Sequence, residues 1–85
     1  MFIVYANFRI VKRELKILSV FSDQIFQLRK EKGISQIAFA KEIGVSLRTY
    51  QDYEYGVREP QLSILCRIAD FYFVSLDYLA GRSDE

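Results

Sequence analysis

The chain has 85 residues, of which 51% are hydrophobic and 15% aromatic, and its formal net charge is +1. This length suits one domain, and the apolar content favours a packed core over a disordered chain. Histidine is absent and Cys66 is the single cysteine, which excludes an internal disulfide, a Cys-cluster metal site and a His-based catalytic pair. We therefore expect no cofactor, no metal, no enzymatic activity and a reducing, cytoplasmic compartment.

The first 20 residues have an ambiguous pattern. Phe2-Ile3-Val4-Tyr5 is β-branched and aromatic, which favours an extended strand. Val11, Leu15 and Leu18 recur at helical spacing, but the surrounding residues show no clean alternation. We expect a strand or hairpin through about residue 18, which would pair with or pack on something such as the same segment of a second chain. The alternative is a loosely packed leader.

Charge is divided unevenly along the chain. Residues 1–21 carry four basic side chains and one acidic side chain, hence +3, whereas residues 22–85 carry eight basic and ten acidic side chains, hence −2. Phosphate neutralisation supplies much of the affinity for nucleic acid, so this division counts against tight binding by the isolated helical part. It makes the basic residues of the leader candidate contacts: Arg9, Lys12, Arg13 and Lys16. No apolar run approaches the ~18 residues of a membrane span, so no membrane partner is expected.

Five helices are predicted from residue 22 onward. Each has a capping serine, a stopping glycine or both, apart from a fourth helix that follows a proline-bearing loop. The first helix is capped by Ser22-Asp23 and stopped by Gly33, and the second is Gln36–Ile43, which follows Ser35. The third helix starts after Ser46 and is closed by Gly56. The fourth helix is about Gln61–Tyr72, and the fifth is Leu76–Ala80, between Ser75 and Gly81.

The second and third of these helices are joined by a tight turn at Gly44. A glycine there can adopt the left-handed conformation that ends one helix and directs the chain into the next. Helical periodicity predicts an inward face in each helix, consisting of Phe39, Ala40 and Ile43, then Tyr50 and Tyr53, then Leu62, Leu65, Ile68, Ala69 and Tyr72. It leaves Leu47, Arg48, Gln51 and Asp52 facing outward. Helix, short turn and helix is the unit that places a second helix in a DNA groove.

Several spaced motifs resemble one family. They are Lys32-Gly33-Ile34-Ser35-Gln36, Ala40-Lys41-Glu42-Ile43-Gly44-Val45-Ser46, Tyr53-Glu54-Tyr55-Gly56-Val57-Arg58-Glu59-Pro60 and residues 68–82. Together they resemble the Cro/lambda-repressor-like helix-turn-helix proteins, also called the XRE family. The resemblance implies an all-α, five-helix DNA-binding domain over residues 21–85, with residues 1–20 as an N-terminal extension. It also implies sequence-specific binding of double-stranded DNA, usually as a homodimer on a two-fold operator, and transcriptional regulation or repression.

The resemblance also implies roles for particular residues. Gln36 would contact the DNA backbone, with a solvated residue as the alternative, and Arg48 would be the best reader of guanine, with a phosphate contact or a free surface arginine as the alternative. Arg29 and Glu54 would form a salt bridge between the first and third helices. Arg58 would approach phosphate, with a free loop cation as the alternative. The whole DNA-facing set implied in this way is Gln36, Ser46, Leu47, Arg48, Thr49, Gln51, Asp52, Tyr55 and Arg58.

Several positions depart from the family pattern. Asp52 would be repelled by phosphate unless it accepts a hydrogen bond from cytosine or neutralises Arg48 four residues earlier. Val57 replaces a frequent lysine, and Phe73 is a poor left-handed cap. Phe71, Tyr72 and Phe73 cannot all face one core, so we expect an exposed aromatic patch. These departures, with the −2 charge, leave open a second function: a protein-interaction module, such as an antitoxin-like partner, that binds another protein through the extension or the aromatic patch.

Overall fold

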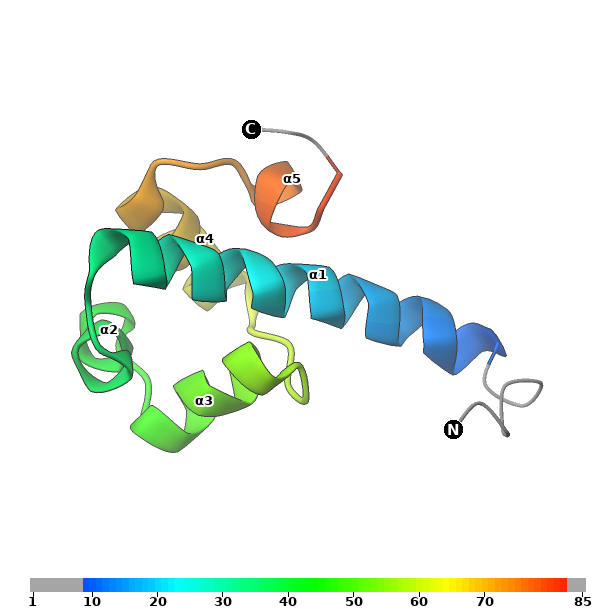
Figure 1. Ribbon diagram of the computed structural model, residues 1–85, viewed down its shortest axis with the longest axis horizontal. Coiled ribbons are helices and arrows are strands. Elements are labelled where there is room, and N and C mark those ends of the chain that lie inside the picture. Colours follow the sequence, from blue (N-terminus) through cyan, green and yellow to red (C-terminus); the bar gives the residue numbers. More distant parts are fainter. Residues whose placement is uncertain (1–8, 83–85) are drawn as a thin grey trace.

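The computed structural model describes the backbone of residues 9–82 and the side chains of residues 20–82. It contains α1 (Arg9–Lys32), α2 (Gln36–Ile43), α3 (Leu47–Tyr55), α4 (Leu62–Tyr72) and α5 (Leu76–Leu79), with no strand among the described residues (Figure 1). The prediction of an all-α, five-helix domain is confirmed. In the part of the chain that is described, no helix has both the length and the apolar character needed to cross a membrane.

Helix α1 corrects two predictions. Residues 9–18 are helical, so the strand or hairpin expected there is wrong, and Ser22 lies inside the helix rather than capping it. The stretch from residue 9 to residue 32 contains neither glycine nor proline, so no residue interrupts a helix once it has formed. The first turns of α1 extend past the other helices (Figure 1), and the boundary expected at residue 20 falls within α1. The strand predicted at residues 2–5 lies outside the described residues.

The capping serines set the starts of the shorter helices. The side-chain oxygens of Ser35, Ser46 and Ser75 accept hydrogen bonds from the backbone N–H three residues later, at 3.1, 3.1 and 2.9 Å. Each such bond satisfies one of the donors that a helix N-terminus leaves without a partner. The starts of α2, α3 and α5 therefore follow from local sequence, as predicted.

The core lies where α1, α2, α3 and α4 meet. Phe39 and Tyr50 are fully buried and pack edge to face, with ring centroids 5.4 Å apart. The other buried members come from all five helices: Phe21, Ile25, Ala40, Ile43, Tyr53, Ile68, Ala69 and Leu79. The inward faces predicted for the second and third helices are confirmed, because every residue named for them is buried.

Helix α4 departs from its predicted inward face at one end. Ile68 and Ala69 are buried, Leu65 and Tyr72 are partly buried, but Leu62 is 67% exposed. Leu62 is the first residue of the helix, one turn before Leu65, so it lies beyond the part of α4 that reaches the core. The prediction that Leu62 is buried is therefore wrong.

The predicted aromatic patch is smaller than expected. Phe71 and Tyr72 pack on Phe39, with centroids 5.0 and 5.1 Å away. Phe73 alone is fully presented, at 91% exposure, and it ends α4 with a left-handed backbone, φ 57° and ψ 44°. A bulky side chain is disfavoured in that conformation, so the poor cap predicted from the sequence is present at this position.

Candidate nucleic-acid interface

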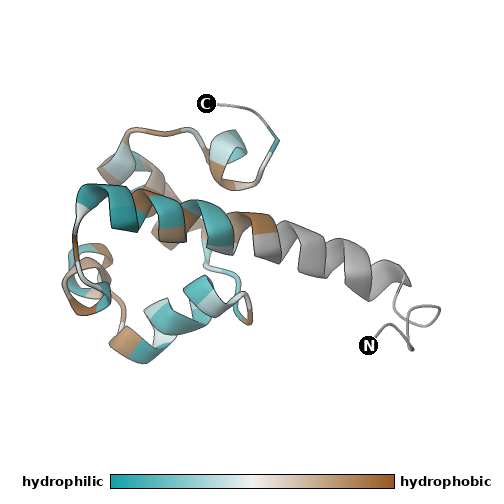
Figure 2. Ribbon diagram, in the orientation of Figure 1, coloured by the Kyte–Doolittle hydropathy of each residue, from teal (hydrophilic) through white to brown (hydrophobic). Residues whose placement is uncertain are grey.

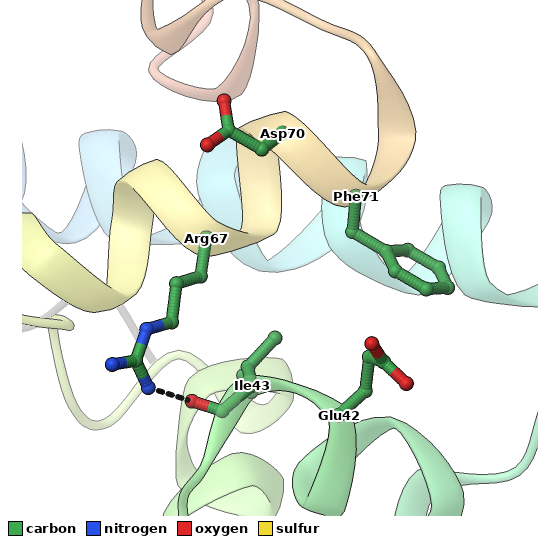
Figure 3. A pocket seen from close by; sticks show the side chains of 5 residues that line it. All are labelled: Glu42, Ile43, Arg67, Asp70 and Phe71. Atoms are coloured by element: carbon green, nitrogen blue, oxygen red, sulfur yellow. Dashed lines mark hydrogen bonds between the residues drawn. The ribbon is translucent and has the colours of Figure 1, made fainter.

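The turn between α2 and α3 depends on a left-handed glycine, Gly44, and on the side chain of Arg67. Gly44 adopts φ 79°, and a Cβ built on it would lie 2.8 Å from Nη1 of Arg67. Arg67 reaches from α4 and donates from Nη1 to the backbone carbonyl of Ile43 at 3.0 Å, while Asp70 points away on the other side of α4 (Figure 3). The cation thus satisfies a carbonyl at the C-terminal end of α2, where the helix dipole favours positive charge. This contact fixes the direction in which the chain enters α3.

The shallow groove that Figure 3 draws between α2 and α4 is lined by Glu42, Ile43, Arg67, Asp70 and Phe71. Its one cationic side chain, Arg67, is already bonded to the backbone of α2. The groove is therefore part of the structure that supports the turn between α2 and α3.

An ion pair fixes α3 to α1. Nε of Arg29 donates to Oε2 of Glu54 at 2.6 Å and Nη2 to Oε1 at 3.2 Å, so the expected salt bridge is present as a two-point contact. The side chains are 11% and 4% exposed. Arg29 also donates to the carbonyl of Ile34 at 2.9 Å, and the hydroxyl of Tyr50 donates to Oε2 of Glu54. Because two charges with this little exposure are stable only when fully hydrogen bonded, the pair fixes the orientation of the C-terminal half of α3.

The surroundings of Glu54 determine its ionisation. Burial by itself would raise the pKa of the Glu54 carboxyl, but hydrogen bonds from Arg29, Tyr50 and Gln36 outweigh burial and lower it below its ordinary value. The hydrogen bond to Glu54 raises the pKa of Arg29, and burial raises that of the Tyr50 hydroxyl. All three groups therefore keep their neutral-pH protonation states, which are the states the hydrogen bonds require.

Gln36 links α2 to this ion pair. Its Nε2 donates to Oε1 of Glu54 at 2.9 Å, and its Oε1 accepts from Nε2 of Gln51 at 3.1 Å. An amide NH₂ has two donors, so one N–H of Gln36 is not used by these two contacts. Gln51, which we expected to face outward, is half-buried between α2 and α3.

Most residues of α3 are hydrophilic, as the colour of its ribbon in Figure 2 shows. Arg48 has an 83% exposed side chain, Leu47 is 37% exposed and Tyr55 is 67% exposed. At the start of the helix the Ser46 hydroxyl donates to Oγ1 of Thr49 at 3.0 Å, besides capping its backbone. Of the residues expected on a DNA-facing surface, five are exposed: Ser46, Leu47, Arg48, Tyr55 and Arg58. The other four are partly buried: Gln36, Thr49, Gln51 and Asp52.

Asp52 sits between two arginines. Its Oδ1 accepts from Nε of Arg48 and its Oδ2 from Nε of Arg58, both at 3.4 Å. The pairing with Arg48 was one of the two alternatives open from the sequence, since the residues are four apart on one helix face. The pairing with Arg58 and the cap that Arg67 provides were missed. Their partners lie 6 and 24 residues away, across loops whose path no local pattern gives.

Five helices with a capped α2, a supported turn and an α3 that faces outward define the class of helix-turn-helix proteins. The family model described as helix-turn-helix matches residues 25–79, and the chain belongs to this family. The match begins inside α1 and ends at the last residue of α5.

Curated relatives are named as regulators. The chain is 39% identical over 67 residues to the HTH-type transcriptional regulator YqaE of Bacillus subtilis, covering 78% of this chain and 58% of that protein. It is 36% identical over 63 residues to the regulator AnsR of Bacillus subtilis, covering 74% and 54%, and 37% identical over 65 residues to the CTXphi transcriptional repressor RstR of Vibrio cholerae, covering 76% and 59%. The match thus spans little more than half the length of these relatives. No solved structure matches the chain significantly.

Proposed function

We propose that this protein is a sequence-specific DNA-binding transcriptional regulator, acting as a repressor in the cytoplasm and binding a two-fold operator as a homodimer. The observation that carries the proposal is the α2–turn–α3 unit, in which α3 is fixed to α1 by the Arg29–Glu54 ion pair while Arg48 stays exposed. The names of the relatives support a regulatory role, and that of RstR supports repression.

In the proposed complex α3 lies in the major groove. Arg48 bonds the two acceptors of a guanine, and Leu47 contacts a base edge, for which a thymine methyl is the apolar match. Gln36 gives its remaining amide N–H to a phosphate, beside the N-terminal end of α3 formed by Ser46 and Thr49, where the helix dipole favours an anion. Further along, Tyr55, Arg58 and the outer edge of Gln51 approach the backbone on the same face.

The basic residues of the extension supply the remaining phosphate contacts in this proposal. Residues 22–85 carry a charge of −2, whereas four of the first 21 residues are basic, namely Arg9, Lys12, Arg13 and Lys16. In this scheme residues 21–85 form the DNA-binding domain, and residues 1–20 add affinity or dimer contacts. Affinity should then fall steeply with salt, by roughly one unit of log–log slope per neutralised phosphate.

One observation favours a second candidate function, a protein-interaction module that binds another protein. Phe73 is 91% exposed and Val57 is 69% exposed, at a position where the family often has lysine. Such side chains suit a protein contact more than a phosphate. A stable heteropartner in a pull-down, together with a monomer by light scattering, would favour this module over the proposed homodimeric regulator.

The test is a selection on random duplex DNA with the full chain at low salt. We expect an enriched motif made of two related half-sites, because a homodimer imposes its two-fold symmetry on its site. The matched control is Arg48→Ala, which keeps the fold but removes the proposed reader of guanine. Absence of any enriched sequence with the unmodified protein would refute the proposal.

A further inference from the structure

Asp52 of α3 contacts two cations at once. Each carboxylate oxygen accepts from a different guanidinium, Oδ1 from Arg48 and Oδ2 from Arg58, both through Nε at 3.4 Å. The Asp52 side chain is only 14% exposed, whereas the Arg48 and Arg58 side chains are 83% and 55% exposed. The anion thus lies beneath the two cations.

This arrangement does little for stability. Ion pairs whose cations are this exposed contribute about 0–1 kcal/mol to folding. An arginine side chain has large rotamer freedom, however, and holding it in one direction before binding removes an ordering cost from the binding step. Both contacts use Nε, so the two terminal amino groups of each guanidinium are not used by Asp52.

The electrostatic consequence has two parts. Two guanidinium groups and one carboxylate leave a net +1 on this surface, so the attraction to any phosphate backbone is weaker than two free arginines would give. The carboxylate at the same time fixes where the two positive charges sit. Attraction to the phosphate backbone does not depend on the DNA sequence, whereas the hydrogen bonds that a guanidinium makes to a base edge do depend on it.

We propose that Asp52 is a positioning residue that orients Arg48 and Arg58 on α3, which lowers non-specific DNA affinity and raises discrimination between sequences. This inference rests on the proposed DNA-binding function. Direct contact of Asp52 with a cytosine amine is disfavoured because both carboxylate oxygens already accept hydrogen bonds and the side chain is mostly covered.

The test compares two duplexes: one enriched from a random duplex library by the unmodified protein, and a shuffled duplex of equal length and composition. Dissociation constants for both are measured by fluorescence anisotropy with four proteins: unmodified, Asp52→Asn, Arg48→Ala and the double variant. Asp70→Asn removes the same charge from an exposed position on α4 and serves as the matched control. Far-UV circular dichroism checks that each protein is folded.

With Asp52→Asn, we expect tighter binding to the shuffled duplex and a fall of about tenfold in the ratio of the two constants, the size expected when one well-placed guanidinium contact is lost. In the Arg48→Ala background the same change should alter the ratio much less, because one of the two oriented arginines is gone. Asp70→Asn should leave the ratio unchanged.

Two results would overturn the inference while leaving the proposed function intact. One is an unchanged ratio in Asp52→Asn. The other is an equal fall of the ratio in the Arg48→Ala background, which would mean that Asp52 does not act by orienting Arg48. If the unmodified protein showed no preference between the duplexes, the proposed function and this inference would fail together.

Discussion

Replacing Glu54 by glutamine should destabilise the fold far more than removing an exposed charge. The variant keeps the size of the side chain but deprives Arg29 of its ion-pair partner, at a site where the two side chains are 11% and 4% exposed. It also replaces a charged acceptor of the Tyr50 hydroxyl and of the Gln36 amide by a neutral one. Removing one partner of a buried pair typically costs about 3–5 kcal/mol.

That loss is a large part of the stability of a small domain, which is about 5–15 kcal/mol. With roughly 4–8 °C per kcal/mol for a domain of this size, the melting temperature should fall by at least about 12 °C. The assay is thermal and urea unfolding followed by far-UV circular dichroism, with Glu42→Gln, which changes an exposed carboxylate on α2, as the matched control. Exposed substitutions of this kind stay within about 0.5 kcal/mol. Equal stabilities of the two variants would refute the idea that the ion pair holds α3.

Three further predictions concern stability. Folding lowers the pKa of the Glu54 carboxyl, so the stabilisation that Glu54 gives is present at neutral pH and is lost as the pH falls from 4.5 through the lowered value. Glu54→Gln should therefore reduce the loss of stability at acid pH in urea titrations at several pH values. An unchanged pH profile would contradict this prediction. Gly81→Ala should destabilise more than Gly33→Ala, since a Cβ on Gly81 would overlap Val20 of α1 while one on Gly33 meets nothing, both at positive φ; equal melting temperatures would count against this packing. Phe73→Gly should stabilise the fold by about 1 kcal/mol by relieving the left-handed cap, and a lower melting temperature would show that the exposed ring packs favourably.

The parts of the fold that could be predicted are those encoded locally. Ser35, Gly44 and Ser46 carry their own capping chemistry, so the helix-turn-helix follows from a few neighbouring residues. Residues 9–18 were mispredicted because the nearby β-branched and aromatic residues favour a strand, whereas the spacing of the apolar residues favours a helix. Local patterns do not show that residues 9–18 belong to the same continuous helix as residues 19–32.

The candidate site divides in the same way. The Arg29–Glu54 pair and the exposure of Arg48 were expected, from the resemblance and from helical periodicity respectively. The inward turn of Gln51 toward Gln36 was not expected, because it depends on the angle between α2 and α3. Contacts of this kind depend on how helices pack, which no spacing of residues gives.

Sequence reading by α3 is tested most directly by the ratio of dissociation constants for an enriched duplex and a shuffled duplex across a salt series. We predict that the enriched duplex binds at least about a thousandfold more tightly at moderate salt, the lower end of the range for specific DNA-binding proteins. We also predict that Arg48→Ala lowers this ratio while leaving binding to the shuffled duplex within a few-fold. Equal affinity for the two duplexes at every salt concentration would contradict sequence reading by α3.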